Sequence, residues 1–168
     1  MRPQRAGAML AVASALIAPG FGKAQQPATM PGMNMPAAIP DRPGLGDLMT
    51  AFVQPRHIKL ALAGAQKNWP YAAYELNELN ETFERVAKLV PRHGNLVIPD
   101  ALAATVKQPM DVLGRAIKAQ DAAAFTAAYA DLTAACNACH ASADHPVIVI
   151  QVPTASPFVD QDFAPPKK

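Results

Sequence analysis

The chain is poor in cysteine, in charge and in long apolar runs. It has two cysteines in 168 residues, and charged residues make up only 17% of it. After the N-terminal region, no apolar stretch approaches the ~20 residues that a membrane-spanning helix needs. The sequence also lacks a phosphate-binding loop, a dinucleotide glycine motif, a Ser-His-Asp order and a paired-carboxylate arrangement. These absences argue against the common classes of hydrolase and nucleotide-dependent enzyme, and we expect no enzymatic activity.

Both cysteines lie in one short motif, Cys136-Asn137-Ala138-Cys139-His140, which matches the attachment signature of a c-type haem. Each thiol can add across one haem vinyl group to form a thioether, and the adjacent His140 is placed to bind the iron as proximal ligand. The sequence therefore predicts one covalently attached haem c, with Cys136, Cys139 and His140 as its binding residues.

A Cys-x-x-Cys pair also occurs in zinc sites and in redox-active dithiols. A zinc site would need two more ligands, but the remaining histidines, His57, His93 and His145, are scattered along the chain. A redox dithiol is expected where a helix begins after a strand, whereas this pair ends a helical pattern. Haem attachment is the preferred interpretation.

Residues 1–24 have the features of a cleaved signal peptide. Arg2 and Arg5 make the start positive, residues 6–18 form a short apolar stretch, and Gly22 and Ala24 supply small residues before the expected cut. We therefore expect a periplasmic protein with no transmembrane segment in its mature form. The leader removes the positive charges of Arg2, Arg5 and Lys23, so the formal net charge falls from +2 to −1. A nearly neutral chain is a poor partner for nucleic acid or anionic membranes.

Residues 25–43 are rich in Pro and Met, show no apolar period and predict a flexible arm. Met30, Met33 and Met35 offer closely spaced thioethers of the kind that suit Cu(I). A flexible arm also tolerates methionine freely, and this interpretation is preferred to a copper site.

Residues 44–143 contain four segments with helical periodicity. The second segment is the clearest: Asn68 and Pro70 suit its start, Pro91 and Gly94 its end, and glutamates such as Glu75 occupy the faces outside its apolar stripe. Its stripe recurs at spacings of four and three and consists of Ala72, Leu76, Leu79, Phe83, Val86 and Val90.

The other three segments are predicted from the same periodicity. The first, about residues 44–66, is interrupted by Pro55, and the third, about 100–120, should kink at Pro109. The fourth begins near Asp121 and continues its apolar stripe through Cys136 and Cys139. Four helices with short links predict an all-α fold, an antiparallel four-helix bundle with both cysteines on its buried seam.

With a leader, four helices and one Cys-x-x-Cys-His near the end of the fourth, residues 44–143 resemble the cytochrome c′ family and related four-helix-bundle monohaem c-type cytochromes. The resemblance implies a periplasmic protein that binds a single haem in an up-down bundle. Two features differ from that family: 25 residues follow Ala143, and Gln54-Pro55-Arg56-His57 stands where the family often has an Arg-Gln pair.

In an antiparallel bundle the fourth helix ends beside the start of the first, so the group opposite His140 should come from the first segment. His57 is the preferred sixth ligand, although a hydrogen-bonded core histidine is an equal alternative. Met49 is the second candidate ligand, and it would raise the reduction potential. Leu60 represents an apolar group that leaves the iron five-coordinate. Arg56 is expected to be a solvated helix charge.

Residues 144–168 are predicted to form an extended tail packed on the bundle. The β-prone run Val147–Val152 predicts a strand-like segment covered on both sides, and Phe158 and Phe163 are candidate anchors. The tail is interpreted either as a strap that excludes water or as a docking strand for a homodimer mate or a redox partner. His93 is expected to face solvent, and His145 to be a turn residue.

The expected function is one-electron transfer between periplasmic redox proteins, a donor and an acceptor that the sequence does not name. The alternative is a five-coordinate haem protein that binds NO or CO. A peroxidase is disfavoured because His57 with the neighbouring Arg56 is the only candidate for a distal acid-base group.

Overall fold

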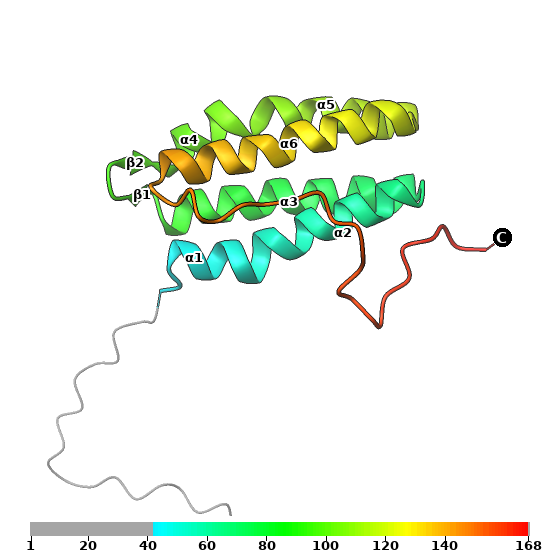
Figure 1. The fold of residues 1–168 in the computed structure, drawn as a ribbon, viewed down its shortest axis with the longest axis horizontal. Helices are drawn as coiled ribbons and strands as arrows, with labels where there is room; N and C mark the ends of the chain where they lie inside the picture. Colours follow the sequence, from blue (N-terminus) through cyan, green and yellow to red (C-terminus); the bar gives the residue numbers. More distant parts are fainter. Residues whose placement is uncertain (1–41, 168) are drawn as a thin grey trace, which may run out of the picture. The chain divides into compact units, whose positions relative to one another are not determined.

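A computed structural model of the chain describes residues 42–167, and these residues fold mainly into helices (Figure 1). The predicted signal peptide and almost all of the predicted Pro- and Met-rich arm, including Met30, Met33 and Met35, lie outside the described residues. The elements in chain order are α1 (Leu45–Leu48), the π-helical turn η1 (Met49–Val53), α2 (Gln54–Ala65), α3 (Trp69–Leu89), β1 (Arg92–His93), β2 (Leu96–Val97), α4 (Ile98–Thr105), α5 (Lys107–Ala119) and α6 (Ala122–Ser142).

The first predicted helix is one continuous stretch whose middle turn is widened. α1, η1 and α2 follow one another without a gap, and in η1 the amide of Gln54 donates to the carbonyl of Met49, five residues back. Pro55 explains the position of this turn, because it has no N–H for the carbonyl of Ala51 and its ring would crowd that carbonyl in an α-helix. The predicted irregularity at Pro55 is therefore confirmed.

The boundaries of α3 follow the predicted signals. The Asn68 side chain accepts a hydrogen bond from the Tyr71 amide, Pro70 lies in the first turn, and the helix ends before Pro91. The next residues form a small antiparallel hairpin, β1–β2, which the sequence analysis did not predict. Its turn includes Gly94 at a φ of 56°, a conformation that glycine adopts at no steric cost.

The third predicted helix is divided into α4 and α5. It begins at Ile98 rather than near Asp100, and it breaks at Val106 rather than at Pro109. Pro109 cannot donate to the carbonyl of Thr105, so the disruption falls one turn before the proline itself. α6 then begins as expected, with the Asp121 side chain accepting from two backbone amides of the first turn.

The long helices pack in pairs. α2 lies along α3 and α5 along α6, the helices of each pair run in opposite directions, and further contacts join α3 to α5 and α2 to α6 (Figure 1). Each of these four helices contributes one leucine with almost no exposed surface to a shared core: Leu60, Leu79, Leu113 and Leu132. The prediction of a mainly helical protein is confirmed.

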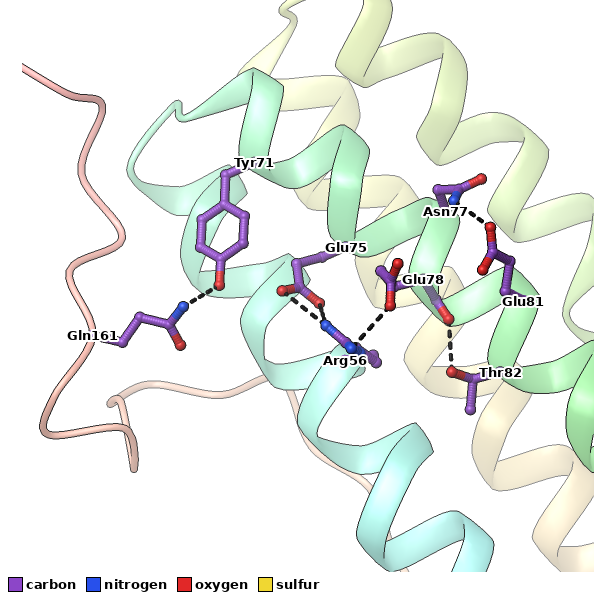
Figure 2. Close-up of polar contacts among 8 residues, drawn as sticks. All are labelled: Arg56, Tyr71, Glu75, Asn77, Glu78, Glu81, Thr82 and Gln161. Atoms are coloured by element: carbon purple, nitrogen blue, oxygen red, sulfur yellow. Dashed lines mark hydrogen bonds and ion pairs between the residues drawn. The ribbon is translucent and has the colours of Figure 1, made fainter.

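A partly buried ion-pair network ties α2 to α3 (Figure 2). Glu75 is only 1% exposed, and its carboxylate accepts hydrogen bonds from Arg56, which also pairs with Glu78 at 2.9 Å. The expectation that Glu75 faces away from the core was wrong. Arg56, expected to be a solvated charge, is 30% exposed and is paired with both glutamates. This pairing explains the burial of Glu75, because a carboxylate can be buried when a guanidinium supplies its hydrogen bonds.

The C-terminal tail runs as an extended chain from the end of α6 toward the start of α3 (Figure 1). Its far end is anchored by Phe163, whose ring stacks on Tyr71 with centroids 5.7 Å apart, and by the Asn68 amide, which donates to the carbonyls of Phe163 and Ala164. Gln161 donates to the Tyr71 hydroxyl (Figure 2).

The apolar run of the tail is not the doubly covered strand that the sequence predicted. Residues 147–152 form no strand, and Val147 and Val149 are 88% and 65% exposed. Ile148 and Ile150 instead line a cavity, although Ile148 keeps 46% of its surface exposed. A nearly continuous apolar run shows no period, so the sequence cannot reveal which of its side chains face the cavity. Within residues 42–167, no helix is long and apolar enough to cross a membrane.

Candidate cofactor site

A cavity of about 200 Å³ lies where the end of α6 meets the start of the first helix. It gathers side chains from every part of the described chain except α5, and most of them are apolar. All five candidate site residues from the sequence line it: Met49, His57, Cys136, Cys139 and His140. The expected proximity of these two helix ends is therefore confirmed. Leu60 is fully buried in the core and does not line this cavity.

Both cysteines of α6 are free thiols that are partly buried beside the cavity. Burial, followed by the neighbouring Cys139, raises the pKa of Cys136 to about 11, and burial also raises the pKa of Cys139. A redox-active dithiol depends on the opposite shift, a thiol pKa lowered by nearby positive charge or by a helix N-terminus. This pair lies instead in the last turns of its helix.

His140, in the last turn of α6, has one ring nitrogen occupied and one free for a ligand. Its Nδ1 lies 2.9 Å from the backbone carbonyl oxygen of Ile148 in the tail. A carbonyl can only accept, so Nδ1 carries the proton in this hydrogen bond. In the neutral imidazole, Nε2 then keeps its lone pair, which is the arrangement that metal-binding histidines use.

Asn137, between the two cysteines, joins α6 to the tail by two hydrogen bonds. Its amide nitrogen donates to the carbonyl of Ile150 at 2.9 Å, and its amide oxygen accepts from the Ile150 N–H at 2.7 Å. One side chain therefore satisfies both backbone groups of a single residue, as a neighbouring strand would. The tail segment that carries Ile148 is held over the end of α6 as a result.

The first helix contributes the facing wall of the cavity. Leu45, Met49, Val53 and His57 all line it, and Met49 and Val53 are the first and last residues of the π-helical turn η1. The Met49 side chain is partly buried against the core. Single π-helical turns inside α-helices occur frequently at functional sites, because they change which residues face a pocket.

His57 is buried, and both of its ring nitrogens are engaged. Nδ1 lies 2.8 Å from the Tyr129 hydroxyl, and Nε2 lies 3.2 Å from the Thr133 hydroxyl. The two hydroxyls also contact backbone carbonyls, of His57 and Tyr129 respectively, so either neutral tautomer can be satisfied. Burial lowers the pKa of His57 to about 4. This geometry is that of a hydrogen-bonded core histidine, the alternative that sequence left open.

Two further histidines lie at the cavity: His145 is the exposed residue of the turn after α6 that was predicted, whereas His93 differs from its prediction. His93 was expected in solvent but is half-buried in the hairpin and lines the cavity, because the hairpin folds back over the helix ends. Its ring centroid is 5.5 Å from that of His145, an exposed residue on the cavity rim. The hairpin that places His93 here was not predicted.

These residues fit a covalently attached haem. The donor set provides two thiols, one imidazole with a free Nε2 and a thioether on the facing wall, and the surroundings are largely apolar. Within the described chain, no group of three or more His, Cys, Asp or Glu side chains is placed to hold a bare metal ion. A haem needs no such group, since its porphyrin supplies four of the iron ligands.

Sequence reasoning missed four residues that shape this site: Asn137, Ile148, Tyr129 and Thr133. Asn137 carried a weak signal, as the only side-chain amide inside the motif. Tyr129 shares the apolar stripe of the cysteines, so its hydroxyl needs a buried partner. Ile148 contributes only a backbone carbonyl, which carries no sequence signal. Comparison with protein-family models, with curated proteins and with solved structures finds no match for this chain.

Proposed function

We propose that this chain is a monohaem c-type cytochrome that carries one electron between periplasmic redox proteins. The observation that carries the proposal is the single cavity lined by both cysteines, His140 and Met49, residues that come from the two ends of the helical chain. A covalently attached haem with protein ligands to its iron requires these four side chains to lie around one cavity. No simpler role for the Cys-x-x-Cys-His motif would use all four of them.

Cys136 and Cys139 would hold the haem through thioethers. In each addition the thiol sulfur forms a bond to one vinyl carbon and the thiol proton passes to the other, so no oxidant or reductant is consumed. His140 would bind the iron through Nε2, the nitrogen that its bond to Ile148 leaves unprotonated. The bound haem supplies an iron that cycles between the ferric and ferrous states.

The fold in this proposal is an antiparallel four-helix bundle, in which α1–α2, α3, α4–α5 and α6 are the four members. The helix pairing and the shared leucine core support it. The bundle, the motif near the end of α6 and the leader together resemble the cytochrome c′ family and related bundle cytochromes. The periplasmic location rests on the signal peptide predicted for residues 1–24.

Met49 is the better candidate for the sixth iron ligand. His57 would have to give up its hydrogen bond to Tyr129 or to Thr133 to bind iron, whereas the Met49 thioether would lose no such hydrogen bond. The proposal therefore differs from the preference for His57 that the sequence alone suggested. A methionine ligand raises the reduction potential and keeps the iron geometry similar in both oxidation states, as electron transfer requires.

Absorption spectra of the purified protein, oxidised and reduced, test the proposal. The haem bands should stay with the chain after denaturation, and they should be lost when both cysteines are replaced by alanine. We expect a low-spin ferric haem that becomes high-spin in Met49→Leu and stays low-spin in His57→Gln. If His57→Gln alone produced the high-spin spectrum, His57 rather than Met49 would be the ligand.

The second candidate function is binding of NO or CO at a five-coordinate iron. The apolar wall of Leu45, Val53 and Phe83 favours it, because such a wall admits small uncharged ligands. Mixing the reduced protein with CO separates the two functions. Rapid uptake by the unmodified protein, with a high-spin spectrum beforehand, would support gas binding, and a low-spin spectrum with little uptake would support electron transfer.

A further inference from the structure

We propose that the C-terminal tail supplies a hydrogen-bond acceptor to the haem ligand His140. The two hydrogen bonds between the Asn137 side chain and the backbone of Ile150, here called the Asn137 clamp, hold the tail in place. The tail held in this way positions the carbonyl of Ile148 to accept from His140 Nδ1. This inference rests on the proposed function. It gives the tail a role in setting the reduction potential, which goes beyond a cover that excludes water.

The carbonyl of Ile148 is held from both sides. On the helix side, the His145 amide donates to the His140 carbonyl at 2.8 Å, and the Ile148 amide donates to the His145 carbonyl at 3.1 Å. On the far side, Ile150 is fixed by the Asn137 clamp. The acceptor for His140 is therefore flanked by ordered backbone, although Ile148 lies in a segment with neither helix nor strand.

The clamp requires an asparagine at position 137. The amide donates to one backbone group of Ile150 and accepts from the other, and a carboxylate of the same size can only accept. The clamp also lies in the same helical turn as both cysteines, so the attachment of haem and the position of the tail depend on one short segment of α6.

A hydrogen bond from Nδ1 to a fixed carbonyl makes the imidazole a stronger electron donor to a bound metal and fixes its tautomer. A stronger donor stabilises ferric iron relative to ferrous iron. Freeing the tail would replace the Ile148 carbonyl with mobile water, weaken this donation and raise the midpoint potential.

The test compares Asn137→Ala and Asn137→Leu, which can neither donate nor accept, with Ala138→Ser, a control at the exposed position between the same two cysteines. Two quantities are measured on haem-loaded protein: hydrogen-exchange protection of the Ile150 amide and the midpoint potential. We expect both Asn137 variants to lose protection at Ile150 and to shift the potential upward, and Ala138→Ser to change neither. The exchange-protected Nδ1 proton of His140 should be seen by NMR in the reduced wild type and lost in Asn137→Ala.

Loss of protection at Ile150 with an unchanged potential would overturn the inference, because the tail would then move without affecting the iron. Retained protection at Ile150 in Asn137→Ala would overturn it as well, since the clamp would not be what holds the tail. Wild-type protein without covalent haem would overturn the proposed function together with this inference, so the two failures are distinguishable. If Asn137→Ala did not retain haem, Asn137→Leu, which fills a similar volume, would give the same two readouts.

Discussion

Two side chains on one wall of the cavity, Met49 and His57, differ chiefly in their hydrogen bonds. The His57 ring is held by two hydroxyls of α6, so it links the first helix to α6 whether or not a cofactor is present. Because the ring is buried and neutral, it adds stability only while it stays unprotonated.

At the residue scale, His57 predicts a pH dependence of folding. Its pKa is about 4 in the folded protein and 6.5 when exposed, so between these values the unfolded chain binds more protons. The stabilisation is complete above pH 6.5 and is lost as the pH falls toward 4, by roughly 3 kcal/mol at most. Urea unfolding at several pH values measures the slope.

The control for this prediction is His57→Gln, which retains a hydrogen-bonding side chain and does not titrate. Its free energy of unfolding should fall less steeply than that of the wild type between pH 6.5 and 4. Identical slopes in the two proteins would show that other groups cause the pH dependence.

A second prediction at the residue scale concerns the Tyr129 hydroxyl. Tyr129→Phe removes the partner of His57 Nδ1 without changing the shape of the core. Leaving that buried nitrogen unpaired should lower the free energy of unfolding by about 1–3 kcal/mol. Chemical denaturation measures the loss. In a His57→Leu background the same substitution should cost much less, because the nitrogen is then absent.

At the scale of elements, the contact between α2 and α6 depends on Gly64. A Cβ built at Gly64 would overlap the ring of Phe125, whereas a Cβ at Gly114 would lie 3.6 Å from the nearest atom, Leu76 Cδ2. Gly64→Ala should therefore destabilise the protein by about 1–3 kcal/mol through overpacking. Gly114→Ala, also within a helix, should stabilise it by about 0.5–1 kcal/mol. Equal effects of the two substitutions would contradict the close packing of α2 on α6.

The pairing of α2 with α3 predicts a strong asymmetry between two ion pairs. Arg56→Met leaves the buried Glu75 carboxylate without its partner and should cost about 3 kcal/mol or more in unfolding free energy. Breaking the exposed pair of Lys107 and Asp111 by Lys107→Met should cost about 0.5 kcal/mol or less. Thermal and chemical unfolding of both variants measures the difference.

A double substitution distinguishes the loss of the ion pair's attraction from the cost of burying an unpaired carboxylate. Replacing both Arg56 and Glu75 by methionine should be less destabilising than Arg56→Met alone, because no buried carboxylate then remains. A double variant that is the least stable of the three would show that the pair itself, not the unpaired charge, dominates the cost.

At the scale of the whole molecule, the tail is anchored at its far end by one buried ring. Phe163→Ala should free the last residues of the tail, with a local loss of about 3 kcal/mol, and should speed proteolytic cleavage between residues 150 and 163. Phe158→Ala, at a ring that is only partly buried, should have a smaller effect. Cleavage of both variants at the wild-type rate would contradict this anchoring.

Sequence predicted the helices well and the tail poorly, for physical reasons. The apolar stripe of α3 and its capping residues are local patterns, so both ends of this helix could be placed from the sequence. The cavity residues followed from one motif and from antiparallel packing. The hairpin that brings in His93 has strands of only two residues, too short for a strand period to show in the sequence, and Ile148 contributes a backbone carbonyl, which no side-chain pattern encodes.

The π-helical turn at Met49–Val53 is equivalent to a phase shift within the first helix. Each residue advances an α-helix by about 100°, so one extra residue in a turn rotates everything before it by that angle. Deleting Ala51 removes one residue before Pro55 and should turn Leu45 and Met49 by that angle, away from the face that α2 presents to α6. The number of residues in this turn therefore decides, as much as the residue types do, which side chains form the cavity wall. A one-residue deletion would change that set of side chains more than most substitutions.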